Sequence, residues 1–271
     1  MTQLVPSGAR ARDFDSNGRY AEAPEARGTV PLTIASYNIH KCVGTDGVFD
    51  PKRIKQVLLS LNADIIALQE ADARFGDRRG LLDLDVLMEL GGYRAVENVG
   101  SRDLSHGWHG NVVLYRKCQV RTTTRLRLPG VEPRGALVVD FDVEGISMRV
   151  IAVHLGLLRR SRSKQLSSIV HAAEPRDRRP VIVLGDMNEW RVSDRSVITQ
   201  LRPHLMDAGE SIASFPSRFP ILALDRILVN DHLTVLEVEA VNTPQSRVAS
   251  DHLPLRATVL LKEAADALGK G

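Results

Sequence analysis

The chain has 271 residues, of which 43% are apolar and 25% charged, ordinary proportions for a globular protein. This length allows one large domain or two small ones, with a core that needs no disulfide or structural metal. The net charge of +3 is too small for a protein that coats nucleic acid, although it suits an anionic substrate. No apolar run is long enough to cross a bilayer, and residues 1–28 lack the apolar stretch of a secretion signal. We therefore expect a cytoplasmic location.

The chain has no internal linker or repeat, which predicts a single folded domain. Residues 1–28 are rich in Arg, Ala, Gly, Pro and Glu without apolar periodicity, as is typical of a flexible leader. We expect the domain to span residues 29–262 and a short tail to cover residues 263–271. The two cysteines, Cys42 and Cys118, have no metal-ligand spacing, and two free thiols are a simpler interpretation than a disulfide.

Short runs of β-branched and other apolar residues predict strands along most of the domain. In chain order these runs are residues 32–37, 65–68, 111–115, 136–139, 148–153, 181–184 and 226–229, with a last strand after Pro254. Helices are predicted after Asp50, which is placed to cap a helix with Pro51 at its first position, and over residues 81–90 and 161–173. This alternation indicates a mixed α/β protein with two packed sheets and helices outside them.

Polar side chains follow the predicted strands at the points where they end. Asn38 ends the first strand, Glu70 follows the second, His154 ends a later one and Asp186 the next. In sheet-based folds, ligands gather at strand ends, so side chains from different strands can converge on one site. Each residue alone has an ordinary explanation: Asp186 could be a turn residue, and His154 a hydrogen-bonded core histidine. The ordered set carries the hypothesis.

The residue types at these ends indicate a hard metal ion and phosphate chemistry. Glu70, Asp251 and the amide oxygen of Asn38 are the ligands that Mg²⁺ or Mn²⁺ takes. The sequence has neither a cysteine cluster nor a His-Glu-x-x-His motif, which argues against zinc. A hard ion offsets charge on a phosphoryl oxygen, amide and imidazole donors hold the others, and a carboxylate orients water.

Six motifs in order resemble those of the endonuclease/exonuclease/phosphatase superfamily, which includes deoxyribonuclease I-like enzymes. They are Ser36-Tyr37-Asn38, Leu68-Gln69-Glu70, His154-Leu155, Gly185-Asp186-Met187-Asn188, Leu224-Asp225-Arg226-Ile227 and Ser250-Asp251-His252-Leu253-Pro254. The resemblance covers residues 32–260, and within the superfamily the chain is similar to a bacterial uncharacterised branch. It implies a four-layer α/β sandwich, in which helices flank two packed mixed sheets, and a metal-dependent hydrolase that acts on phosphate esters.

The resemblance assigns the metal and the attacking water to acidic and amide side chains. Glu70 would be the principal Mg²⁺ ligand, with Mn²⁺ as a substitute, and Asn38 and Asp251 would make further or water-mediated contacts. Asp186 would orient or deprotonate the attacking water, and Asn188 would hold a phosphoryl oxygen.

The histidines and an arginine complete the implied site. His252 would either hydrogen-bond the scissile phosphate or act as the base, and Asp225 would fix its tautomer. His154 would donate to a non-bridging oxygen, and Arg134 matches the place of a phosphate-facing arginine in many members.

One stretch departs from the nuclease members. Where abasic-site endonucleases often carry a tyrosine that faces the phosphate, this chain has Trp108-His109-Gly110-Asn111. Any step that needs that tyrosine is expected to be supplied by His109 or to be absent, and Asn111 is expected to help position His252 or the substrate.

The sequence leaves the phosphate ester open between a nucleic acid and a phospholipid or other small phosphodiester. Aromatic residues make up only 4% of the chain, which gives few platforms for stacking bases. Arginines follow Glu70 and His154, at residues 74–79 and 159–162, where they could meet phosphates or form a solvated face. The apolar segment 215–222 could make peripheral contact with a membrane or belong to the core.

A non-enzymatic function remains as the alternative. The same fold could serve as a binding module with an inactive site, but such a copy would be expected to lack one or more of the site residues. Here the set is complete, which favours an enzyme, and no obligate protein partner is inferred.

Overall fold

The computed structural model describes residues 29–73, 76–97, 104–174, 179–191, 196–209 and 212–262. The expected leader (residues 1–28), the expected tail (residues 263–271) and Arg74 lie outside the described residues. Within those ranges, none of the helices is long and apolar enough to cross a membrane.

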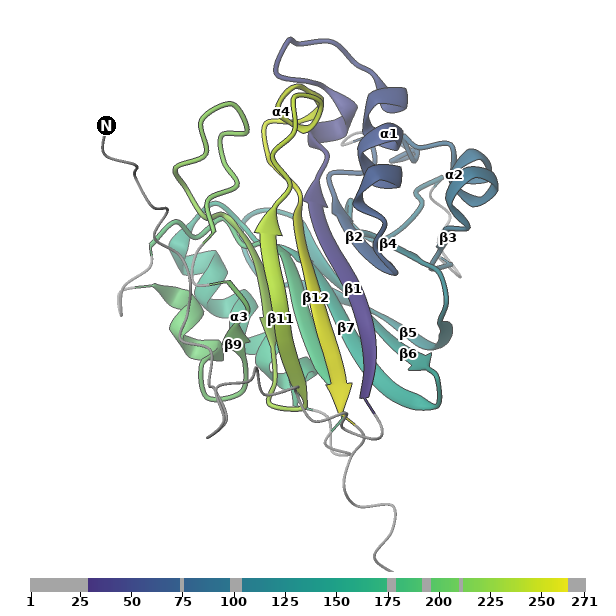
Figure 1. Cartoon of the computed structure of the whole chain (residues 1–271). Helices are drawn as coiled ribbons and strands as arrows, with labels where there is room; N and C mark the ends of the chain where they lie inside the picture. Colours follow the sequence, from purple (N-terminus) through teal and green to yellow (C-terminus); the bar gives the residue numbers. More distant parts are fainter. Residues whose placement is uncertain are drawn as a thin grey trace, which may run out of the picture.

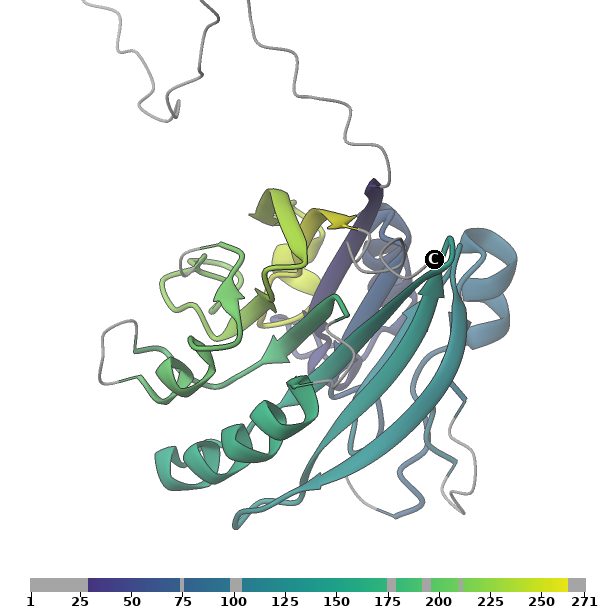
Figure 2. The ribbon, with the colours of Figure 1, turned by 90° about the horizontal axis from the view of Figure 1, so that it is seen from below.

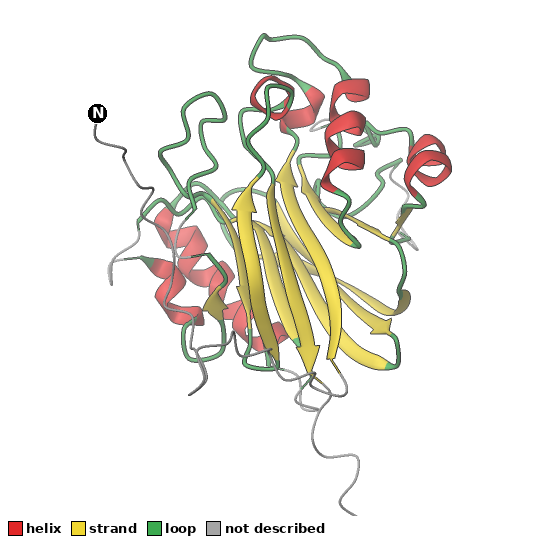
Figure 3. Ribbon diagram, viewed as in Figure 1, coloured by secondary structure: helices red, strands yellow, loops and turns green. Residues whose placement is uncertain are grey.

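Two six-stranded sheets form the centre of the molecule, with helices on the outside (Figures 1 and 3). The first sheet has the order β11 (Leu233–Ala240), β12 (Leu255–Lys262), β1 (Thr29–Asn38), β2 (Ile65–Gln69), β4 (Val112–Tyr115) and β3 (Arg94–Ala95). The second has the order β5 (Gln119–Leu128), β6 (Arg134–Val143), β7 (Ile146–His154), β8 (Val181–Asp186), β10 (Asp225–Val229) and β9 (Met206–Asp207). β1 and β2 pair in parallel, as do β7 and β8, and the other pairings are antiparallel, so both sheets are mixed.

The helices begin and end where the local sequence dictates. They are α1 (Pro51–Leu61), α2 (Leu84–Gly91), α3 (Arg159–Ala173) and α4 (Ser246–Ala249), with short 3₁₀ segments η1 (His40–Cys42) and η2 (Val197–Leu201). As predicted, the Asp50 carboxylate caps α1 by accepting from Arg53 N at 3.1 Å, and Pro51 takes the first position. α2 begins at Leu84, three residues later than expected, because Asp83 supplies its cap. Gly92, in the left-handed conformation, ends it.

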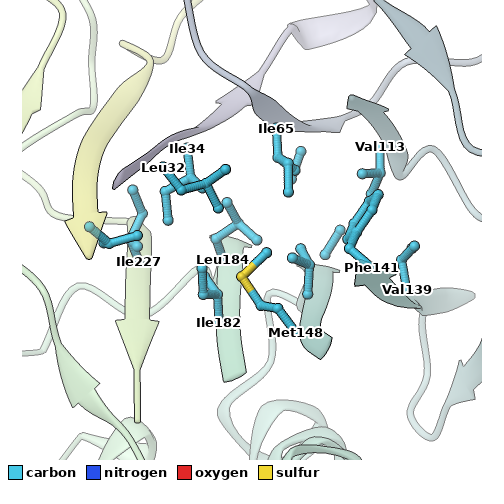
Figure 4. Close-up of a cluster of buried hydrophobic side chains, with 14 of the residues drawn as sticks. Leu32, Ile34, Ile65, Val113, Val139, Phe141, Met148, Ile182, Leu184 and Ile227 are labelled. Carbon is cyan, nitrogen blue, oxygen red and sulfur yellow. The ribbon is translucent and has the colours of Figure 1, made fainter. Parts of the chain in front are cut away.

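Three apolar clusters separate four layers. The cluster between the sheets joins β1 and β2, through residues such as Ile34 and Ile65, to β6 and β8 of the second sheet, through Phe141 and Leu184 (Figure 4). A second cluster packs the first sheet on α1 and α2, and a third packs the second sheet on α3 and η2 (Figure 2). This arrangement confirms the four-layer α/β sandwich with two packed mixed sheets and flanking helices.

The four edge strands of these sheets, β3, β5, β9 and β11, were not predicted. β5 lies at one edge of the second sheet, and its sequence is rich in Thr and Arg, with most side chains exposed. β11 lies at one edge of the first sheet and is mostly half-buried or exposed. Because an edge strand has one paired side and few buried side chains, it carries no apolar run to reveal it.

Candidate functional site

Polar side chains from both sheets meet at one end of the sandwich. Asn38 ends β1 and Glu70 follows β2, and because these strands are parallel both residues lie at the same edge of the first sheet. His154 and Asp186 pair across the parallel strands β7 and β8 of the second sheet. Asp225 starts β10, which runs antiparallel to β8, so it pairs directly with Asp186. The expected convergence of strand ends is therefore present.

The Asp186 carboxylate is the centre of this arrangement. Its Oδ2 accepts a hydrogen bond from Asn38 Nδ2 at 3.0 Å, across the two sheets. The same oxygen lies 3.5 Å from His154 Nε2 and 3.9 Å from His252 Nε2. All four side chains are buried or nearly so. Two imidazoles and an amide therefore surround one carboxylate oxygen.

A buried carboxylate holds His252 from behind. The distance from His252 Nδ1 to Asp225 Oδ2 is 2.7 Å, and Ser214 Oγ donates to the same oxygen at 2.5 Å. The Phe215 ring packs against the imidazole, with 4.9 Å between ring centroids. With Nδ1 bound to Asp225, the Nε2 edge of His252 turns toward Asp186.

Burial and neighbouring charges set the protonation of this pair. Burial raises the pKa of the Asp186 carboxyl, and the charge of Asp225 raises it further, while His252 and the hydrogen bonds from Asn188 and Asn38 oppose the rise. For His252, burial by itself lowers the pKa, but the charge and hydrogen bond of Asp225, with the charges of Asp186 and Asp251, raise it to about 10. These surroundings favour the imidazolium.

The Gly185-Asp186-Met187-Asn188 turn depends on its glycine. Gly185 has φ of +147°, and a Cβ there would lie 1.9 Å from the carbonyl oxygen of Val153 on β7. The turn continues with Asn188 at φ of 49°, a conformation that asparagine tolerates. Asn188 N donates to Asp186 Oδ1 at 2.9 Å, and its Nδ2 donates to the Leu155 carbonyl at 2.9 Å. Asn188 thus joins the loops that follow β7 and β8.

Arg134 enters the site from the start of β6. Its NH1 lies 2.8 Å from Nδ1 and 2.9 Å from Nε2 of His154, so the guanidinium faces the imidazole. Its Nε lies 3.5 Å from Glu132 Oε2, and that carboxylate also accepts from Leu157 N at 2.9 Å. A cationic side chain is therefore fixed beside His154.

The three predicted metal ligands line one cavity. Asn38, Glu70 and Asp251 border a space of about 360 Å³ together with Asp186 and other site residues. In the described part of the chain, no three acidic, histidine or cysteine side chains are close enough to hold a metal by themselves. Two carboxylates and an amide oxygen fit a hard ion such as Mg²⁺, which keeps several waters and takes few protein ligands.

A left-handed turn after β1 brings two basic residues to these carboxylates. His40, Lys41 and Cys42 have φ values of 42°, 54° and 60°, an uncommon run for residues other than glycine. Lys41 Nζ forms an ion pair with Glu70, and His40 Nδ1 lies 3.8 Å from Asp251 Oδ1. The turn thus places the Lys41 ammonium beside Glu70 and the His40 imidazole beside Asp251.

A second cavity, of about 390 Å³, continues the groove beyond Glu70. The two cavities share Glu70, Glu132, Arg134 and His154. Lys41, Arg78 and His109 line only the second cavity. The Arg78 guanidinium is held by Asp72 through bonds of 2.9 and 3.0 Å, so this arginine is engaged within the protein.

His109 and Asn111 lie in different settings. His109 lines the second cavity, with its ring edge-on to Trp108 at 4.5 Å between centroids. Asn111 is fully buried, lines neither cavity, and donates to the carbonyls of Trp108 at 3.2 Å and Gly135 at 3.0 Å. It holds the turn that carries His109 against the start of β6.

Sequence reasoning missed three residues of the site. Lys41 lies three positions after Asn38, and that proximity was its only signal. Glu132, in the loop before β6, and Ser214, which holds Asp225, belong to no motif. Only their tertiary contacts reveal them.

The site lies at the ends of the central strands of a four-layer α/β sandwich. The sequence pattern of the endonuclease/exonuclease/phosphatase family matches residues 35–252, and the chain belongs to that family. Members of the family are phosphoesterase hydrolases.

The chain is similar in sequence to a protein from Escherichia coli (strain K12). That protein, named "Uncharacterized protein YbhP", is 27% identical over 259 residues, which is 88% of this chain and 100% of the relative.

Solved structures share the fold at low identity. An endonuclease/exonuclease/phosphatase from Beutenbergia cavernae has a TM-score of 0.68 at 22% identity, over 86% of this chain and 72% of that chain. A Bacteroides thetaiotaomicron mannosyl-6-phosphatase has a TM-score of 0.65 at 19% identity, over 84% and 99%. D. rerio TDP2, complexed with a single-strand DNA product, has a TM-score of 0.64 at 17% identity, over 84% and 98%.

Proposed function

We propose that this protein is a Mg²⁺-dependent phosphodiester hydrolase, with Mn²⁺ as a substitute ion. The observation that carries the proposal is the position of Asp186 Oδ2, 3.0 Å from the Asn38 amide, 3.5 Å from His154 and 3.9 Å from His252. A carboxylate so placed can orient a water and take its proton, while the imidazoles face the oxygens of a phosphoryl group.

Asn38, Glu70 and Asp251 would hold the ion, which when bound offsets negative charge on the phosphate. Arg134 and His154 donate to non-bridging oxygens from the β6 and β7 side of the groove. The backbone N of Asn188 donates to Asp186 and so holds the water-orienting carboxylate in place. The side-chain Nδ2 gives one hydrogen to the Leu155 carbonyl and has a second with which to hold a phosphoryl oxygen. His252, fixed by Asp225, donates from Nε2 to a phosphoryl oxygen.

The completeness of the site supports an enzyme over an inactive binding module. Each of the acidic, amide and imidazole groups is present, and those around Asp186 touch one another in the interior. Among the structural relatives, one is named as a sugar phosphatase and another as holding a DNA product, so the phosphoester of this chain is proposed as either a nucleic acid or a small or lipid-borne phosphodiester.

The test is hydrolysis by the purified protein with Mg²⁺, Mn²⁺ or EDTA. The substrates are plasmid DNA, single-stranded DNA, an inositol polyphosphate, a phospholipid and bis-p-nitrophenyl phosphate. We expect EDTA-sensitive cleavage that falls about a hundred-fold or more in Asp186→Asn, because the variant keeps the shape of the side chain but loses the base. Asp231→Asn changes a carboxylate whose side chain is 86% exposed, outside the groove, and serves as the matched control. Hydrolysis that is equal in EDTA, or equal in Asp186→Asn, would contradict the proposal.

A further inference from the structure

Large apolar side chains stand exposed on the loops around the catalytic groove. Val131 is 82% exposed, Phe219 79% and Ile221 76%, and the set also includes Leu157, Leu158 and Trp190, each more than half exposed. Single exposed apolar residues are normal on a protein surface. These six lie on loops next to the site residues Arg134, His154, Asp186 and Asp225, and their grouping therefore needs an explanation.

Three of these loops are joined on one side of the groove. Leu157 N donates to Glu132 Oε2 at 2.9 Å, which connects the loop after β7 to the β5–β6 hairpin that carries Val131. At the start of α3, Arg162 pairs with Glu189 at 3.3 Å, and Glu189 directly precedes Trp190. The exposed side chains of Val131, Leu157, Leu158 and Trp190 are thus carried by one connected unit.

The loop 215–222 also borders the groove. Phe215 and Leu222 pair as an isolated bridge at its base, and Phe219 and Ile221 lie in the turn that this bridge closes. Phe215 lines the same cavity as Leu157. In Figure 1 this green loop stands at the same end of the molecule as the loop that follows β1. The groove is therefore bordered by two exposed apolar edges, the connected unit and this loop.

The charges interspersed with these apolar residues are basic. Arg159 and Arg160 follow Leu158 and are exposed, and Arg218 precedes Phe219. The guanidinium of Arg191 lies 4.5 Å from the centroid of the Trp190 ring. Among the described residues of the same loops, the acidic side chains are engaged within the protein: Glu189 is fully buried, and Glu132 lines the groove. Apolar tips with arginines between them match the boundary between acyl chains and anionic headgroups.

We propose that these loops dock the protein onto an anionic phospholipid bilayer, with the catalytic groove facing the headgroup layer. The proposal rests on the proposed function and narrows its substrate to a phosphoester at a lipid surface. A nucleic acid fits less well, because only Trp190 and Phe219 of the six offer a ring on which a base could stack. The other four side chains are aliphatic. A protein partner that covered both edges would close the groove, whereas a bilayer presents its own phosphates to it.

The test is binding to vesicles of phosphatidylcholine alone and of phosphatidylcholine with phosphatidylglycerol, measured by co-sedimentation and by tryptophan emission. We expect the wild-type protein to bind the anionic vesicles with a blue shift that is lost in Trp190→Phe. The double variant Phe219→Glu/Ile221→Glu should bind at least about ten-fold more weakly, because two apolar side chains no longer enter the interface. Leu236→Glu, at a residue 56% exposed in the middle of β11, is the matched control and should bind as the wild type does.

Hydrolysis of bis-p-nitrophenyl phosphate, which needs no membrane, is measured on the same variants. Neither Phe219 nor Ile221 lines either cavity of the groove, so this activity should stay at the wild-type level. The docking surface would be overturned if the wild-type protein did not bind anionic vesicles, or if the double variant bound them equally well. It would also be overturned if the double variant lost binding to an oligonucleotide instead of binding to vesicles. Vesicle binding without any hydrolysis would uphold the docking surface and contradict the proposed function alone.

Discussion

Arg162 and Glu189 form an ion pair of 3.3 Å in which both side chains are buried. Arg162 NH1 also donates to the carbonyls of Gly156, at 3.2 Å, and Leu157, while Glu189 Oε1 accepts from Arg191 N at 3.0 Å. The pair connects the loop after His154 to the loop after Asp186. Two loops that carry site residues are thus held together by one buried contact.

Replacing one partner of this pair leaves the other buried without its counter-charge. Arg162→Ala should therefore lower the free energy of unfolding by roughly 3–5 kcal/mol. Urea denaturation followed by circular dichroism measures the change. The exposed neighbour Arg160 provides the comparison, since Arg160→Ala should alter stability by less than about 0.5 kcal/mol. Equal changes in unfolding free energy for the two substitutions would show that the buried ion pair does not stabilise the fold more than an exposed arginine does.

The hydrogen bond between Asp225 and His252 fixes the face that His252 presents to the groove. Asp225→Asn should lower kcat by roughly 10–100-fold with a smaller change in KM, because the ring loses its carboxylate partner. Ser214→Ala removes only a neutral hydrogen-bond donor to Asp225 and should lower kcat by less than Asp225→Asn does. Steady-state kinetics on the substrate found in the hydrolysis panel measure both variants. A larger loss in Ser214→Ala than in Asp225→Asn would contradict this order.

Gly185 has no room for a side chain. In Gly185→Ala the new Cβ would meet the Val153 carbonyl between the paired strands β7 and β8, at a φ of +147°. We expect a loss of roughly 3 kcal/mol in unfolding free energy. Gly47 also has a positive φ, of 75°, but nothing lies within 4 Å of its Cβ position. Gly47→Ala should therefore cost only about 1 kcal/mol. Similar melting temperatures for the two variants would refute the steric explanation.

Asp140 on β6 should contribute to the pH dependence of stability. Burial by itself raises the pKa of Asp140, but hydrogen bonds from Arg149 and Thr122 and the charges of Arg149 and Arg179 outweigh it and hold the pKa below its usual value. Because the native pKa lies below that of the unfolded chain, about 3.9, the unfolded state takes up the proton more readily. The stabilisation is therefore present above about pH 4 and is lost as the pH falls through the native pKa.

Asp140→Asn tests this expectation. The variant should be less stable than the wild type by roughly 1–3 kcal/mol near pH 6, because charged hydrogen bonds are lost. The difference should shrink as the pH falls below about 4, where the unfolded wild-type chain takes up a proton at Asp140, and should be lost as the pH passes through the lower native pKa. Urea midpoints measured at several pH values between 6 and 2.5 check this convergence. A difference that stays constant over the whole range would rule out the ionisation of Asp140 as its source.

The two thiols should be slow to react in the native protein. Both cysteines are free, and burial, with the charges of Asp50 near Cys42 and Asp64 near Cys118, raises each thiol pKa to about 12. Little thiolate, the reactive form, is then present at pH 8. Labelling with iodoacetamide at pH 8 should be much slower than for the same protein in urea. Equal rates in the two conditions would contradict the raised pKa values.

The sequence by itself determined the buried centre of the fold. The apolar runs of β1, β2, β4, β6, β7, β8 and β10 were predicted because strands covered on both faces must be apolar along their length. The Asp50 cap and the polar strand ends from Asn38 to His252 were also readable, since they depend on residue type and local order. The edge strands β5 and β11 were not, because half-exposed strands resemble loops in composition.

Only the tertiary structure decided which groups touch and which way they face. Lys41 pairs with Glu70 because a left-handed turn redirects the chain after β1, and Ser214 reaches Asp225 from eleven residues away. The sequence left the segment 215–222 open between core and membrane contact, and folding exposes Phe219 and Ile221 while burying Ser217. The hydrophobic effect favours the burial of apolar residues in general. Which of them are buried depends on how loops that are distant in the sequence pack together, and only the folded chain decides that.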